Sequence, residues 1–207
     1  MSYYFTILSP TDAPLFNIAF GTSKSGGDGI ARFRFPDAAQ NTYMTQFIIH
    51  SSLDMLEEAQ WMGGNMYLKH IDTYPPASAY ISAFLTPSGT RFLLLHQPPQ
   101  PNLPPSGAGG GSGGIGSSTM SLGSSTIGMG GTGLFGGSGV GSSGRTSSSS
   151  IAANPTAPQT EEAVRQFMTE VYEAYVKTVM NPFYRRGMEI RSPVFRSKVS
   201  AAGRKWL

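Results

Sequence analysis

The chain has 207 residues, no cysteine and a formal net charge of +3 at pH 7. Without cysteine, disulfide frameworks, cysteine-ligated zinc sites and thiolate chemistry are excluded, and a reducing intracellular compartment is the expected environment. The longest apolar run near the middle of the chain, Phe92 to Leu95, is far shorter than the roughly 20 residues that span a bilayer. Residues 1–8 lack the basic and long apolar regions of a signal peptide, so we expect a cytoplasmic chain.

Five strands and three helices are predicted along the chain. Aromatic and β-branched residues indicate the strands, and apolar residues at helical spacing indicate the helices. Pro and Gly residues mark the turns between them. The strands are predicted at residues 3–8, 15–20, 66–71, 79–86 and 90–96, and the helices at 41–61, 161–179 and 194–206. Hairpin strands with helices between them predict an α+β fold, a five-stranded antiparallel sheet with helices packed on it.

Residues 97–159 differ in composition from the rest of the chain. They contain 17 glycines, 14 serines and 7 prolines, and Arg145 is the one charged residue among them. Little in this composition could be buried to offset the entropy of ordering the backbone, so we predict a disordered Gly/Ser/Pro-rich insert. Because the insert falls between the last strand and the second helix, it interrupts a single domain formed by residues 1–96 and 160–207.

The first predicted helix has a wide apolar face with an acidic residue beside it. The apolar residues of that face are Met44, Phe47, Ile48, Ile49, Leu53, Met55 and Leu56. Asp54 lies among them and is followed by Glu57 and Glu58. The spacing alone favours a solvated acidic face. The alternative is an acidic docking spot beside exposed apolar residues, which would suit a protein partner.

The C-terminal stretch is strongly basic, with seven basic residues and one acidic residue in 181–207. It lacks the aromatic interleaving of single-strand binders and any helix-turn-helix or zinc signature, so no nucleic acid is expected. An anionic membrane surface or an acidic partner is favoured instead. Asn181-Pro182-Phe183-Tyr184 has the form of a sorting motif, but an Asn-Pro pair that ends a helix, with both aromatics covering the core, is the favoured interpretation.

The three histidines, His50, His70 and His96, give no sign of a catalytic or metal site. None has a carboxylate or second histidine at metal-ligand spacing. We interpret them as ordinary polar residues and expect no cofactor, no metal and no catalytic residue. A hydrolase that uses one of them is the enzymatic alternative, since a catalytic triad is assembled in space rather than in sequence.

Several short stretches together resemble the sedlin family, the second small subunit of the TRAPP vesicle-tethering complexes. They are His50–Asp54, Asn65–Lys69, Ser82–Phe84, Arg91–His96, Met180–Tyr184, Ile190–Ser192 and Phe195–Val199. The similarity covers nearly all of residues 1–96 and 160–207, while residues 97–159 depart from the short connection expected in the family.

The resemblance implies a longin-like fold of element order ββαβββαα, with one helix on one face of the sheet and two C-terminal helices on the other. It also implies a non-catalytic adaptor in a complex that activates a Rab-type GTPase and serves transport from the endoplasmic reticulum to the Golgi and autophagy. Its partners would be the TRAPP core subunits and the larger complex-specific subunits, its association with those membranes would be peripheral, and Asp54 would contribute to docking. A sedlin-like paralogue, or a longin-type small subunit of another trafficking coat, is the alternative.

Overall fold

A computed structural model describes residues 1–22, 28–36, 41–98 and 156–207. The predicted order of strands and helices is confirmed. The strands are β1 (Ser2–Leu8), β2 (Pro14–Gly21), β3 (Tyr67–Tyr74), β4 (Ala79–Leu85) and β5 (Arg91–Gln97). The helices are α1 (Asn41–Ser51), α2 (Leu53–Met62), α4 (Pro158–Val179) and α5 (Pro193–Trp206), with a 3-10 turn, η3, at Pro75–Ala77.

The ends of the predicted insert belong to regular elements. Gln97 closes β5, where it lies opposite Ser2 of β1, and Pro158 and Gln159 begin α4. The low-complexity residues 99–155, on which the prediction of disorder falls, lie outside the described residues.

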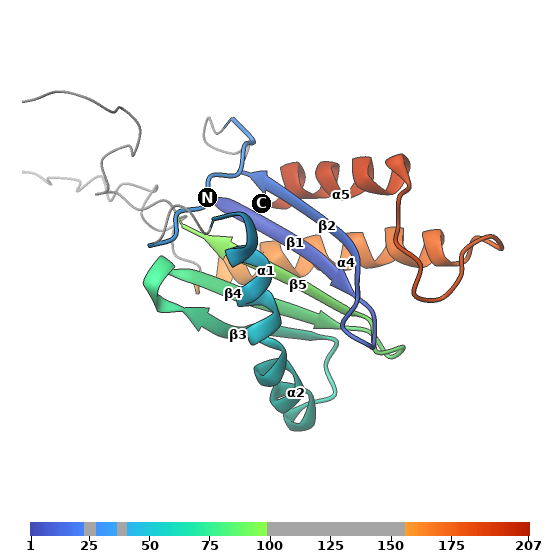
Figure 1. Cartoon of the computed structure of the whole chain (residues 1–207), viewed down its shortest axis with the longest axis horizontal. Helices are drawn as coiled ribbons and strands as arrows, with labels where there is room; N and C mark the ends of the chain where they lie inside the picture. The colour runs from blue at the N-terminus through green and yellow to red at the C-terminus, as the bar shows by residue number, and fades with distance from the viewer. Residues whose placement is uncertain (23–27, 37–40, 99–155) are drawn as a thin grey trace, which may run out of the picture. The chain divides into compact units, whose positions relative to one another are not determined.

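The five strands form one antiparallel sheet in the order β2-β1-β5-β4-β3 (Figure 1). Phe5 at the middle of β1 lies opposite Ile18 of β2 and Leu94 of β5. The β1–β2 turn is closed by the Ser9 hydroxyl, which accepts hydrogen bonds from the backbone N–H groups of Thr11 and Ala13 at 3.2 and 3.1 Å. Such local side-chain bonds stabilise a turn against the alternative of extending the strand.

Helices cover both faces of this sheet (Figure 1). Along β5, Phe92 and Leu94 pack in the cluster formed with α4 and α5, whereas Leu93 and Leu95 pack in the cluster formed with α1 and α2. Successive strand residues point to opposite faces, so a strand covered on both sides is apolar throughout. This explains the unbroken apolar run of residues 92–95 and confirms the predicted layers.

The helix predicted over 41–61 is divided into α1 and α2 at Ser52. The hydroxyls of Ser51 and Ser52 donate to the backbone carbonyls of Ile48 and Ile49, both at 2.8 Å. Back-bonding of this kind bends a helix. The backbone bonds continue across the bend, since Ser52 N–H donates to the Ile48 carbonyl at 3.1 Å and Leu56 N–H to the Ser52 carbonyl at 3.0 Å. Asp54 therefore stands in the first turn of a separate short helix rather than in the middle of a long one.

Among the helices that the structure describes, none combines the length and the apolar character needed to cross a membrane.

Candidate functional site

Asp54 lies in the first turn of α2, and its side chain is exposed. Within the described residues its carboxylate has neither a hydrogen-bond donor nor a cationic partner. The positive end of the helix dipole favours an acidic residue at this position. The negative charge is thus available at the surface to a partner from outside the chain.

Four large apolar side chains are exposed on α1 and α2, the two helices around Asp54 in the sequence. Tyr43, Phe47, Met55 and Trp61 are all exposed, Trp61 by 91%. Within α1 the spacing of four residues places Tyr43 and Phe47 on one side, and within α2 the spacing of seven does the same for Asp54 and Trp61. Beside α2, Trp61 also lines a hollow of about 430 Å³ together with Glu57 and Gln60. We name these five residues, Tyr43, Phe47, Asp54, Met55 and Trp61, the α1–α2 surface.

The wide apolar face predicted for residues 41–61 is divided between core and solvent. Ile48, Ile49, Leu53 and Leu56 are buried against the sheet. Phe47 and Met55, which the sequence places on the same face, are exposed. The face is wider than the strip of sheet beneath it, so its outer edge stays in water. Phe47 and Met55 therefore remain at the surface of the two helices, the second of which carries the unpaired charge of Asp54.

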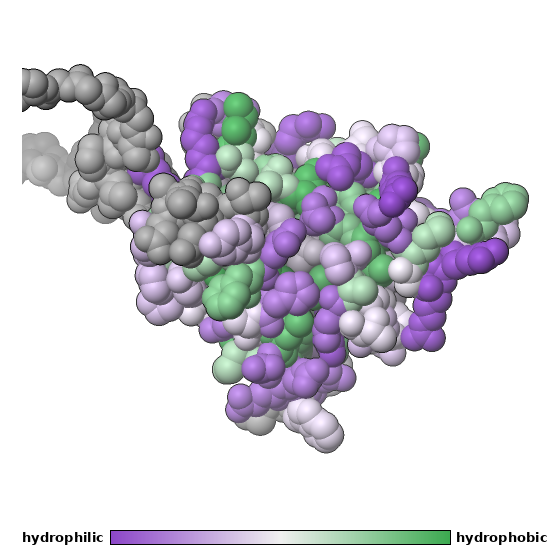
Figure 2. All heavy atoms as spheres, in the orientation of Figure 1, coloured by the Kyte–Doolittle hydropathy of each residue, from purple (hydrophilic) through white to green (hydrophobic). Residues whose placement is uncertain are grey.

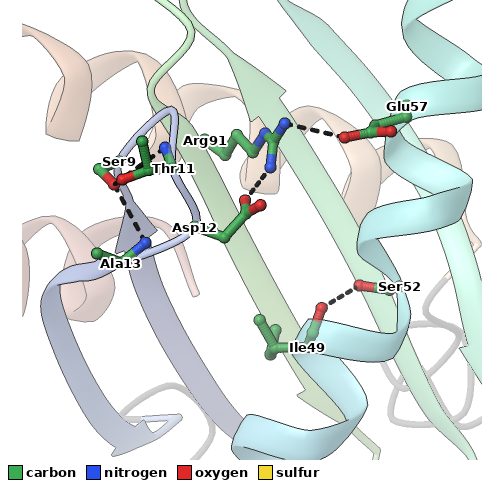
Figure 3. Close-up of polar contacts among 8 residues, drawn as sticks. All are labelled: Ser9, Thr11, Asp12, Ala13, Ile49, Ser52, Glu57 and Arg91. Carbon is green, nitrogen blue, oxygen red and sulfur yellow. Dashed lines mark hydrogen bonds and ion pairs between the residues drawn. The ribbon is translucent and has the colours of Figure 1, made fainter.

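An arginine that the sequence analysis did not single out holds α2 in place (Figure 3). Arg91 begins β5, and its guanidinium contacts the carboxylate of Asp12 in the β1–β2 turn and that of Glu57 in α2, the latter at 3.2 Å. The Arg91 side chain is largely buried between them. Because Glu57 is one turn after Asp54, this contact orients the part of α2 that presents Asp54. The sequence signal is weak, since an arginine at the start of a strand is common.

The segment between α4 and α5 corrects the interpretation of Asn181–Tyr184 in part. α4 ends at Val179, and Asn181 forms the following turn by accepting the Phe183 N–H on its side chain and the Tyr184 N–H on its carbonyl. Tyr184 packs against the core as predicted. Phe183 does not: it is 87% exposed. In this turn Tyr184 alone of the two aromatics packs against the core.

The basic C-terminal stretch is not one continuous patch. Arg196 lies over the ring of Phe16 at 5.3 Å, and Lys205 pairs with Glu170 at 2.9 Å. Hydrogen bonds from Lys205 and Trp206 lower the pKa of Glu170. These contacts attach α5 to the sheet and to α4. Part of the positive charge therefore serves the fold, and the rest remains at the surface.

The histidines do not converge on one site. His50 is exposed on α1, whereas His70 and His96 lie on either side of Tyr80, at ring distances of 5.4 and 5.6 Å. His96 is buried, both of its ring nitrogens lack a partner among the described residues, and burial lowers its pKa to about 4. Nowhere in the described ranges do three His, Cys, Asp or Glu residues gather closely enough to hold a metal ion.

An open five-stranded antiparallel sheet with helices on both faces places the chain in the longin-like class of α+β folds. The sequence model described as Sedlin matches residues 7–205, and the chain belongs to the sedlin family.

Relatives match from end to end. The chain is 26% identical to the transport protein particle 20 kDa subunit of Schizosaccharomyces pombe, with all of both chains covered. It is 26% identical to the probable trafficking protein particle complex subunit 2 of Drosophila melanogaster, covering all of this chain and 97% of the relative. It is 28% identical to the trafficking protein particle complex subunit 20 of Saccharomyces cerevisiae, covering all of this chain and 99% of the relative.

Proposed function

We propose that this chain is a non-catalytic adaptor subunit of a trafficking protein particle (TRAPP) complex. The proposal is supported by membership of the sedlin family and by relatives that are named as subunits of that particle and match over their whole lengths. The exposed, uncompensated Asp54 within the α1–α2 surface is the observation that carries the adaptor role. In this role the chain contacts other TRAPP subunits through its surfaces and performs no chemistry itself.

The α1–α2 surface is proposed to dock a larger, complex-specific subunit, while other faces contact the core. Its chemistry specifies the partner: a basic side chain opposite Asp54, surrounded by apolar side chains that cover Phe47, Met55 and Trp61. Covering the apolar residues would exclude water from the charge pair, which makes the pair stronger than one at an exposed rim. The anchoring of α2 by Arg91 supports this role, since a surface held in place loses less conformational entropy on binding.

The wider setting of the proposal follows the family resemblance. The complex would activate a Rab-type GTPase, and would act in transport from the endoplasmic reticulum to the Golgi and in autophagy. The chain would reach those membranes peripherally, through the complex. Residues 1–96 and 160–207 would form the single working domain, and residues 100–155 of the insert would be dispensable for assembly.

Native co-purification of the tagged chain tests the proposal, with Asp54→Ala as the variant and Glu58→Ala as the matched control. Both residues are exposed carboxylates on α2, one turn apart. We expect the Asp54→Ala protein to retain the core subunits and lose the larger ones, by roughly thirtyfold in affinity for a desolvated charge pair. Equal capture of the larger subunits by both variants would refute the docking role, and absence of every TRAPP subunit from the wild-type preparation would refute the adaptor.

A further inference from the structure

A second exposed apolar group lies at the connection between α4 and α5. We name residues 180–191 the α4–α5 tip. Met180 is 75% exposed and Phe183 87% exposed, and Met188 is also exposed. Figure 2 shows apolar atoms at the outer end of this connection with strongly hydrophilic atoms beside them. Phe183 makes no ring contact and is not buried against the rest of the described chain. An exposed large apolar side chain of this kind is typical of a binding surface.

Hydrogen bonds build the tip into a defined shape. The side chain of Asn181 accepts the Phe183 N–H at 3.0 Å, and the Tyr184 hydroxyl donates to the Met188 carbonyl at 3.0 Å. Gly187 takes a φ of +83°, which favours glycine, so that the chain can turn back. The returning end is fixed to the sheet, because the Ile190 N–H donates to the Leu15 carbonyl at 2.8 Å. Phe183 is thus held outward by the turn rather than left there by a loose loop.

The charge around the tip is positive. Residues 180–191 contain three basic residues and one acidic residue. The acidic one, Glu189, is bound to Arg191 at 2.8 Å and does not offset the others. Arg185 and Arg186 follow Phe183 closely and are exposed, and the contact of Arg186 with the neutral Ser88 carbonyl at 3.4 Å leaves its charge uncompensated.

We propose that the α4–α5 tip inserts Phe183 and Met180 into the interface of an anionic lipid bilayer while Arg185 and Arg186 contact the headgroups. Apolar side chains on one side and cations beside them are the combination that binds such a surface. A negatively charged bilayer satisfies both features at once, because it offers hydrocarbon to the aromatic ring and phosphates to the guanidinium groups. A bilayer also accepts a protruding tip without the matching pocket that a protein would have to supply.

The proposal is independent of the docking role of Asp54. The α1–α2 surface lies on one face of the sheet and α4 and α5 lie on the other (Figure 1). The tip could therefore contact a membrane while α1 and α2 are covered by a partner subunit.

Vesicle flotation of the full chain tests the proposal directly. The probes are vesicles of phosphatidylcholine alone and of an equal mixture of phosphatidylcholine and phosphatidylserine. We expect binding to the mixed vesicles that weakens as salt is raised. Phe183→Ser should lower the partition by at least tenfold, and Arg185→Gln with Arg186→Gln by roughly thirtyfold. All three positions are exposed, so circular dichroism should show an unchanged fold.

Two matched controls distinguish insertion at the α4–α5 tip from nonspecific adsorption of the chain to vesicles. Ile30→Ser removes an exposed apolar side chain from the segment between β2 and α1, and Lys198→Gln with Arg204→Gln removes two exposed charges from α5. Neither control should approach the loss caused by its counterpart at the tip. The proposal is overturned if the wild-type chain does not bind the mixed vesicles, if Phe183→Ser binds as wild type, or if the α5 charges matter as much as Arg185 and Arg186.

Discussion

Burial of His96 predicts that the fold loses stability in mild acid. The imidazole is 2% exposed and stacks on Tyr80 at 5.6 Å, with Tyr3 on its other neighbouring strand at 6.3 Å. Burial disfavours the charged form and lowers the pKa of His96 from 6.5 to about 4. Repulsion by His70 lowers the pKa further.

The sign and size of the effect follow from this pKa. Below pH 6.5 His96 becomes protonated in the unfolded chain, whereas in the folded chain it stays neutral down to about pH 4. The stability that the neutral, buried His96 contributes is therefore fully present above pH 6.5, and this contribution is lost as the pH falls from 6.5 to 4. One pKa unit corresponds to about 1.4 kcal/mol, so lowering the pH from about 7 to about 5 should cost about 2 kcal/mol from this residue alone.

Urea denaturation followed by circular dichroism at about pH 7 and about pH 5 measures this cost. His96→Leu keeps a similar volume, cannot be protonated and removes two unpaired ring nitrogens, so the difference in unfolding free energy between the two pH values should shrink by about 2 kcal/mol. His50→Gln, at an exposed position of α1, leaves His96 in place and should keep the wild-type difference. If His96→Leu loses as much stability in acid as the wild-type chain does, the reasoning from burial is wrong.

Two further outcomes follow from the contacts of the fold. Arg91→Gln should lower the free energy of unfolding by about 1–2 kcal/mol, because it removes the cationic partner of both Asp12 and Glu57. If a double-mutant cycle of Arg91→Gln with Glu57→Gln gives no coupling energy, the contact between these two residues does not stabilise the fold. Replacing residues 100–155 by a Gly/Ser linker of about fifteen residues should leave Tm within about 3 °C, since it keeps Ala157, whose carbonyl accepts the first hydrogen bonds of α4. A large fall in Tm would mean that the insert packs on the domain.

Much of the fold could be predicted because local patterns reflect local structure. The strands were recognisable from aromatic and β-branched residues, and α4 from a single apolar face that repeats over its whole length. The unbroken apolar run of β5 agrees with a strand covered on both faces. The boundaries moved by a few residues, as they do where capping and pairing rather than composition decide the end.

The features that sequence reasoning missed depend on distant parts of the chain. The contact of Arg91 with Asp12 and Glu57 joins three elements, and no spacing in the sequence announces it. The exposure of Phe183 follows from a turn whose returning end is fixed to Leu15 across the fold. Both features depend on the packing of elements that are far apart in the sequence.

The candidate site shows the same division. Apolar spacing correctly placed Asp54 on a helix beside large apolar residues. The spacing could not show which of these apolar residues the sheet would cover. Periodicity predicts the direction in which an apolar helix face points, but not how wide the sheet surface beneath it is. Burial in the structure separates Phe47 and Met55, left exposed, from Leu53 and Leu56 in the core.

The adaptor role depends most directly on whether the charge of Asp54 recruits the larger subunits. The decisive measurement is the ratio of larger to core subunits, by quantitative mass spectrometry, in complexes purified through Asp54→Asn and Glu58→Gln forms of the chain. Both substitutions remove one charge from α2 with little change of shape. We predict that the ratio falls by roughly tenfold or more for Asp54→Asn and stays at the wild-type value for Glu58→Gln. An unchanged ratio for Asp54→Asn would contradict the proposed docking surface.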